Sequence, residues 1–288
     1  MLLKIDKLHA YIFSDSNLKS FEKLILFLAA GGFILHLALI YLNLNYNISL
    51  LKGLDDLLRN PISALYTPFS FILIYEAFLL IYYFPRSFTT SIAKEYEIIS
   101  LVMIRKVFGD IPMLNFEEGI INQAGLVLLY DLLAILIIYY LIHLFKKTIL
   151  NIPKRKPNIN INRFISYKKM LSIALLPILL LLCVSNLYDW SYAVFVTQEF
   201  LENVNYIFFI DFFTILILVD VFILLISFQY TERYSQILRN TGFIISTILL
   251  RLSFSVSGVS SLILLLSGVV FGLIILKIYQ ISEVELKQ

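Results

Sequence analysis

Blocks of about 20 mostly apolar residues, separated by short polar stretches, run along most of the chain. The alternation of apolar and polar positions that is typical of barrel strands is absent, so the blocks predict helices. A helix of about 20 residues spans about 30 Å, which is the thickness of the hydrocarbon core of a bilayer. The apolar segments lie at 22–44, 64–84, 92–108, 120–145, 168–188, 205–229, 240–256 and 258–279.

The composition excludes a soluble protein with a single core. Of the 288 residues 60% are hydrophobic and 15% are charged, and the mean hydropathy is +0.87. Soluble domains average about 45–50% apolar and about 25% charged residues. Cys183 is the only cysteine, which rules out a disulfide within the chain. The sequence therefore predicts an all-α polytopic integral membrane protein.

The third and seventh apolar segments are short, and they contain Arg105 and Arg251. If they lay on the membrane surface, each half of the chain would have three spans instead of four. The stretch Lys146–Lys169 holds eight basic residues and no acid, which is typical of a cytoplasmic loop. The N-terminal Lys4, Lys7, Lys19 and Lys23 also favour the cytoplasm. An even number of spans must lie between these two regions, and four fits.

The charge pattern thus predicts about eight transmembrane helices with both termini in the cytoplasm. The predicted parts are a cytoplasmic or interfacial segment at 1–21, a first four-helix membrane unit at 22–145, a basic cytoplasmic linker at 146–167, a second four-helix unit at 168–279 and a cytoplasmic tail at 280–288.

The two halves resemble each other. Residues Ile98, Ile99, Ser100, Arg105 and Phe108 recur 146 positions later as Ile244, Ile245, Ser246, Arg251 and Phe254. In the preceding segment, Glu76 recurs as Asp220 at a spacing of 144. These matches predict an internal repeat. Because each half has an even number of spans, the two repeats are expected to be parallel, related by an axis along the membrane normal.

Charged side chains inside the apolar segments are the candidate functional residues. A charge at the bilayer centre costs about 2.5–3.5 kcal/mol on insertion scales, so these groups should face protein or water. The first hypothesis pairs Glu76 with Arg105 and Asp220 with Arg251. The alternative is that both arginines anchor their helices at the membrane interface. Asp131, Asp211 and His36 complete the candidates for an ion or solute pathway.

The chain lacks the sequence signatures of several function classes. The chain has no regularly spaced arginine series of a voltage sensor, no TVGYG filter and no GxxxxGK[ST] loop, and its three histidines lack metal-ligand spacing. We therefore expect no enzyme, no metal and no cofactor, although an enzyme acting on lipid stays open. Nucleic acid is not an expected partner.

The expected function is a membrane channel or secondary transporter that moves a small ion or solute with the help of intramembrane carboxylates. The alternative is a non-catalytic membrane subunit or scaffold, whose buried charges hold helices together or bind a partner. Apart from the bilayer itself, anionic lipid headgroups are a candidate partner of Lys146–Lys169. The sequence is compatible with a monomer and with an oligomer.

Overall fold

The computed structural model describes residues 2–46, 58, 60–111, 123–152, 161–193, 196, 204–231, 233–256 and 258–285. Within these ranges the chain is helical and contains no strand, which confirms the all-α prediction. The elements are α1 (Leu2–Ile12), α2 (Asp15–Tyr46), the 3-10 helix η2 (Pro61–Leu65), α4 (Tyr66–Tyr83), α5 (Phe88–Asp110), α6 (Gln123–Leu150), α7 (Ile161–Tyr192), α8 (Val204–Phe228), α9 (Tyr234–Ser253) and α10 (Val259–Glu285).

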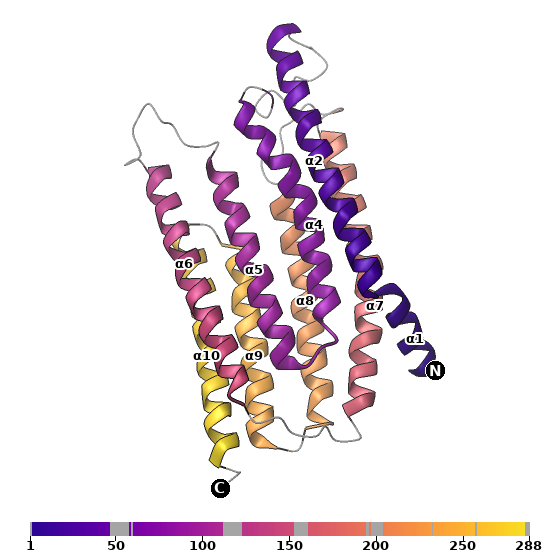
Figure 1. The fold of residues 1–288 in the computed structure, drawn as a ribbon, viewed down its shortest axis with the longest axis vertical. Helices are drawn as coiled ribbons and strands as arrows, with labels where there is room; N and C mark the ends of the chain where they lie inside the picture. Colours follow the sequence, from indigo (N-terminus) through magenta and orange to yellow (C-terminus); the bar gives the residue numbers. More distant parts are fainter. Residues whose placement is uncertain are drawn as a thin grey trace.

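Six helices are long and apolar enough to cross a membrane, namely α2, α4, α6, α7, α8 and α10, which supports a membrane protein. The helices α5 and α9 coincide with the third and seventh predicted spans but do not reach that apolarity. Both nevertheless run alongside the other long helices (Figure 1). Helix α5 packs against α4 and α6, and α9 packs against α8 and α10. Eight crossings therefore stay a prediction.

Three predicted boundaries differ from the observed helices. The N-terminal segment at 1–21 contains α1 and the first turns of α2. The predicted linker at 146–167 is partly helical, because α6 continues to Leu150 and α7 begins at Ile161, while 153–160 lie outside the described residues. The predicted tail is also helical as far as Glu285. In each case polar residues extend an apolar helix beyond its hydrophobic part.

Short connections make neighbouring helices antiparallel. Between α4 and α5, Pro85 lacks the backbone N–H that a continuing helix needs, and the Ser87 side chain accepts a hydrogen bond from the N–H of Thr90 at the start of α5. Between α9 and α10, Gly258 adopts a φ of 68°, a left-handed conformation that favours glycine. Both connections are only a few residues long, so each pair of helices packs side by side.

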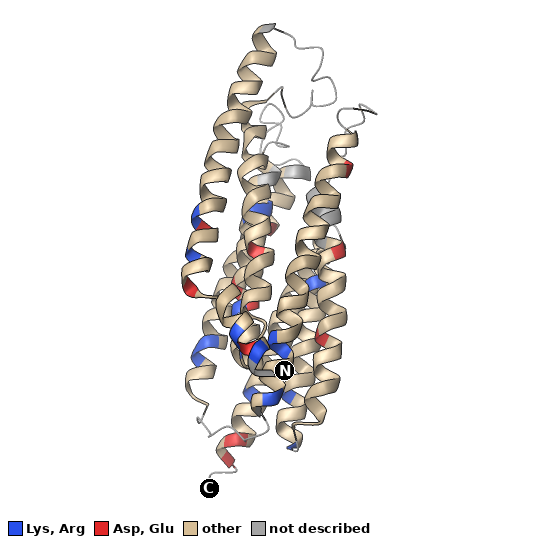
Figure 2. Ribbon diagram, turned by 90° about the vertical axis from the view of Figure 1, so that its right-hand side faces the viewer, with Lys and Arg blue, Asp and Glu red and all other residues tan. Residues whose placement is uncertain are grey.

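Contacts between helices follow the same order in both halves. In the first half α2 packs on α4, α4 on α5 and α5 on α6; in the second α7 packs on α8, α8 on α9 and α9 on α10. Across the halves, α5 contacts α9, α6 contacts α10 and α4 contacts α7. Both termini lie toward the same end of the bundle (Figure 1). Lys and Arg residues gather toward that end as well (Figure 2).

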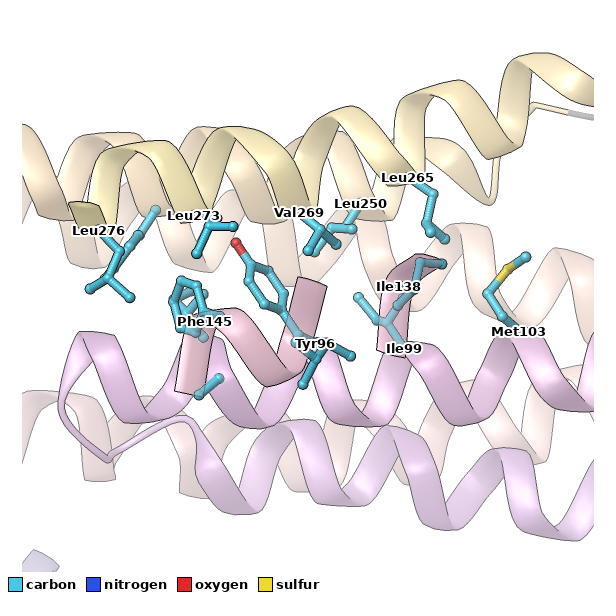
Figure 3. Close-up of a cluster of buried hydrophobic side chains, with 14 of the residues drawn as sticks. Tyr96, Ile99, Met103, Ile138, Phe145, Leu250, Leu265, Val269, Leu273 and Leu276 are labelled. Carbon is cyan, nitrogen blue, oxygen red and sulfur yellow. The ribbon is translucent and has the colours of Figure 1, made fainter. Parts of the chain in front are cut away.

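The largest apolar core lies where α5, α6, α9 and α10 meet (Figure 3). Tyr96 of α5 points toward α10, and its hydroxyl lies 2.6 Å from Oγ of Ser246, which donates a 2.7 Å hydrogen bond to the carbonyl of Gly268. A Cβ atom at Gly272 would overlap the Tyr96 hydroxyl. Gly268 and Gly272, four residues apart on α10, thus allow α5 and α9 to pack closely against α10. Small residues have the same role in membrane helices.

Candidate functional site: buried charges between the two halves

Arg251 lies at the centre of a buried charge cluster formed by three helices. Its Nη1 atom on α9 donates a 2.6 Å hydrogen bond to Oδ2 of Asp220 on α8. Its Nη2 atom donates a 2.7 Å hydrogen bond to Oε1 of Glu95 on α5. Only 3% of Arg251, 4% of Asp220 and 6% of Glu95 is exposed. The cluster therefore joins α5 of the first half to α8 and α9 of the second.

Asp220 receives a second hydrogen bond. Thr247 precedes Arg251 by four residues on α9, so that both side chains lie on the same face of the helix. The Thr247 hydroxyl lies 3.1 Å from the same Oδ2 atom of Asp220 and 2.9 Å from the carbonyl of Ile244, so its single proton is shared between these two acceptors. Asp220 thus accepts from Arg251 and shares the Thr247 donor with a backbone carbonyl. The charged form of a carboxylate is stabilised by each such bond.

Two small cavities flank Glu95, each with room for about one water molecule. Their linings share Glu95, Phe84 and Ser91. The first cavity is also lined by Leu80, Tyr83, Ile98, Leu216 and Arg251. The second is also lined by Phe88, Ile92, Lys168, Asp220, Ile223 and Ile244. Glu95 is therefore the acidic residue that borders both spaces.

Lys168 of α7 places a fourth charged group at the second cavity. It is 3% exposed, and its Nζ atom donates a 2.7 Å hydrogen bond to the backbone carbonyl of Arg86. The ammonium group also lies over the rings of Phe84 and Phe88, at 5.2 and 4.9 Å from their centroids. Cation–π contacts and a carbonyl thus hold this buried cation.

The second arginine hypothesised to pair with an acid, Arg105, lies beside Glu76. Its Nη2 atom is 3.5 Å from Oε2 of Glu76, and its Nη1 atom donates a 3.1 Å hydrogen bond to the carbonyl of Phe69. The guanidinium thus sits between two groups about two turns apart on α4. This contact is longer than the one between Arg251 and Asp220. It joins neighbouring helices of the first half.

Asp131 is fully buried on α6, and its partner is Lys106 of α5. The Lys106 Nζ atom lies 3.0 Å from Oδ2 of Asp131. Consecutive residues of a helix point about 100° apart, so Arg105 reaches α4 while Lys106 reaches α6. Asp131 was predicted from the sequence as a pathway residue, but its pairing with Lys106 was not predicted.

His36 and Asp211 lie apart from the cluster around Arg251. Nδ1 of His36 on α2 is 2.7 Å from the hydroxyl of Thr67 on α4. Thr67 precedes Glu76 by nine residues, which is about 14 Å along a helix. Asp211 is exposed on α8. Of the four acids named from the sequence, only Asp220 lines either cavity beside Glu95.

Glu95 and Lys168 were not among the site residues predicted from the sequence. The signal for Glu95 was its helical spacing, since Ile92, Ile99 and Val102 share its face of α5 and are all buried. Glu95 lies next to the charged residues Lys94 and Glu97, which form a 2.8 Å ion pair with each other. With these neighbours, the sequence around Glu95 resembles the solvent-exposed end of a helix. The same spacing test applies to Lys168, which shares a face of α7 with the buried residues Ser172, Leu175 and Leu179.

Three residues of the basic stretch Lys146–Lys169 contact other parts of the protein, and binding of lipid headgroups by this stretch stays a prediction. Lys146 pairs with Glu97 at 2.6 Å, Lys168 is buried, and Lys169 pairs with Asp6 of α1 at 2.8 Å. Lys147 and Arg163 are exposed. The remaining basic residues, Lys154, Arg155 and Lys156, lie outside the described residues.

Comparison of the chain with family models, with curated proteins and with solved structures finds no match. Among the residues that the structure describes, no group of three or more histidine, cysteine or acidic side chains is arranged to hold a metal ion. The geometry of the cluster is thus the basis for a functional hypothesis.

Proposed function

We propose that this protein is a secondary transporter or channel that moves a small ion or solute across the membrane through the cluster of Glu95, Asp220 and Arg251. The observation that carries the proposal is that two carboxylates, one from each half of the chain, bind the same buried arginine. Ionised side chains at membrane depth are costly, and by default they are candidates for an ion or proton pathway. The adjacent cavities give such a pathway space for water.

The proposal includes an internal repeat of two parallel four-helix units. Its support is that each half pairs an acid on its second long helix with an arginine on its third, as Glu76 with Arg105 and Asp220 with Arg251. The order of helix contacts is also the same in both halves. Transporters built from repeats bind their substrate near the midplane between the repeats. The contact between α5 and α9 joins the two proposed repeats and is the position that we propose for the substrate.

The proposed topology has eight crossings and cytoplasmic termini. Its support is the placement of both termini and of many basic residues toward one end of the bundle (Figures 1 and 2). Positively charged residues flanking membrane helices favour the cytoplasm. Membrane-impermeant labelling of single cysteines in a Cys183→Ser background tests this topology. Labelling from outside at Lys4→Cys or Glu285→Cys would contradict it.

A non-catalytic membrane subunit is the second candidate. The observation that favours it is that the buried acids Glu76 and Asp131 are each bound by a basic residue of α5, so that the charges hold α4, α5 and α6 together. Polar contacts of this kind stabilise membrane helix pairs by about 0.6–2 kcal/mol. In this role the chain itself would transport nothing.

Flux through purified protein in liposomes separates the two candidates. Gradients of protons, sodium, potassium and chloride are applied one at a time, and the wild type is compared with Asp220→Asn. The matched control is Asp211→Asn, which neutralises the exposed acid on the same helix. Transport through the cluster predicts flux that Asp220→Asn reduces and Asp211→Asn preserves. Equal flux in both folded variants would show that the cluster is not part of the pathway. If liposomes with wild-type protein show no flux of any of these ions, the non-catalytic membrane subunit is favoured.

A further inference from the structure

The charge cluster has an unequal number of acids and bases. With all groups ionised, Asp220 and Glu95 contribute two negative charges and Arg251 one positive charge. The additional positive charge lies on Lys168 at the edge of the second cavity. Within the described residues Lys168 makes no ion pair with either carboxylate, and its ammonium group binds the carbonyl of Arg86. A buried carboxylate without its own counter-ion is costly, and binding a proton removes that cost.

We propose that the transported ion is the proton and that Glu95 carries it, while Asp220 and Arg251 remain a fixed ion pair. This inference rests on the proposed transport function. The charged or titratable groups that face Glu95 across the two cavities are Arg251 on α9, Asp220 on α8, Lys168 on α7 and Tyr83 on α4.

Two observations select Glu95 over Asp220. Asp220 accepts a hydrogen bond from Arg251 and shares the Thr247 hydroxyl with the carbonyl of Ile244, and both contacts stabilise its charged form. Glu95 accepts one bond, from Arg251. Glu95 also lines both cavities, whereas Asp220 lines only the second of the two. The side chain with fewer donors and access to two spaces is the one suited to exchange a proton between them.

The lining of the cavities favours a proton over a metal cation. Among the described lining residues, the first cavity has one carboxylate, Glu95, and the second has two, Glu95 and Asp220. The other lining residues are mostly apolar, and hard metal cations need several oxygen ligands. A proton needs only one carboxylate oxygen and a water molecule.

The proposed proton step transfers one proton between water and Glu95. A hydronium ion in one cavity gives its proton to a carboxylate oxygen of Glu95, which uses a lone pair to form the O–H bond, and the donor is left as water. Release into the other cavity reverses the step with a water molecule as acceptor.

Infrared difference spectroscopy between high and low pH tests the assignment, because a protonated carboxylic acid has a carbonyl band that a carboxylate lacks. The variants are Glu95→Gln and Asp220→Asn, and Glu97→Gln serves as a control because it neutralises an acid of the same helix that pairs with Lys94 and Lys146. Since every acid that titrates contributes to this band, each variant is compared with the wild type. The inference predicts that Glu95→Gln loses the component of a carboxyl group shielded from water and that the other two variants keep it. An unchanged band in Glu95→Gln, or loss of that component in Asp220→Asn, would overturn it. If Glu95→Gln does not fold, Glu95→Asp must shift the band.

Flux measurements distinguish this inference from the proposed function. If the band is lost in Glu95→Gln but wild-type liposomes move no ion, Glu95 binds a proton and the proposed transport function is wrong. Flux driven by a sodium gradient but not by a pH gradient, with no titrating band, would keep transport and reject the proton.

Discussion

Replacing Arg251 by glutamine is the sharpest test of the charge cluster. The arginine is 3% exposed and binds Asp220 and Glu95 at 2.6 and 2.7 Å. Without it, two buried carboxylates face each other with no guanidinium between them. Removing one partner of a buried ion pair costs about 3–5 kcal/mol, because the remaining charge stays uncompensated. At 1.4 kcal/mol for each factor of ten, the folding equilibrium should shift by roughly 10²- to 10⁴-fold.

The assay is an unfolding titration with SDS in mixed micelles, followed by far-UV circular dichroism. Arg163→Gln is the matched control, because it makes the same replacement at an exposed position near the start of α7. A triple variant that combines Arg251→Gln with Asp220→Asn and Glu95→Gln has no buried charge left in the cluster. It should regain most of the lost stability, since neutral replacements of buried ionic groups are often tolerated.

The results separate the electrostatic cause from simple loss of packing. If the free energies of unfolding of Arg251→Gln and Arg163→Gln differ by less than about 0.5 kcal/mol, the cluster does not stabilise the packing of the helices, and the reasoning fails. If the triple variant is as unstable as Arg251→Gln, the loss reflects side-chain packing instead of uncompensated charge.

Two further predictions concern α5 and its neighbours. Gly272→Ala should destabilise the fold by about 1–3 kcal/mol, because the added methyl group overlaps the Tyr96 hydroxyl, and Tyr96→Phe should restore part of the loss. Gly31→Ala, where a Cβ meets no atom within 4 Å, is the control, and equal unfolding free energies for the two glycine variants would contradict the overlap. Lys106→Gln and Asp131→Asn should be non-additive by about 0.5–3 kcal/mol in a double-mutant cycle of unfolding, because the two side chains bind each other at 3.0 Å. Additive effects would show that this contact does not contribute to stability.

The sequence predicts the helices and part of the site. Apolar blocks place the apolar parts of the long helices, because burying such blocks in a bilayer leaves little choice of structure, but polar residues extend α2 and α7 by about two turns at their starts. The recurrence of an acid and an arginine pointed to Glu76 with Arg105 and to Asp220 with Arg251, and these side chains are in contact in the structure. Apolar spacing alone does not establish that α5 and α9 cross a membrane, since both helices carry too many polar residues.

The third member of the cluster could not be found from repeat matching. Glu95 has no acidic counterpart in the second half, since the residue 146 positions later is Thr241. It contacts Arg251 only because α5 packs on α9, and contacts between residues so far apart in sequence depend on the tertiary arrangement. The charged neighbours Lys94 and Glu97 also made the sequence around Glu95 resemble an exposed helix end. A search for polar residues on an otherwise buried helix face finds both Glu95 and Lys168.

The measurement that tests the account most directly is the current of reconstituted protein on a supported membrane after a step in pH. Wild-type protein, Glu95→Gln and Glu97→Gln are compared at equal protein density. The account predicts a current for wild-type protein and for Glu97→Gln, and none for folded Glu95→Gln. A current of wild-type size in Glu95→Gln would contradict the claim that the cluster between the two halves is the path of the ion.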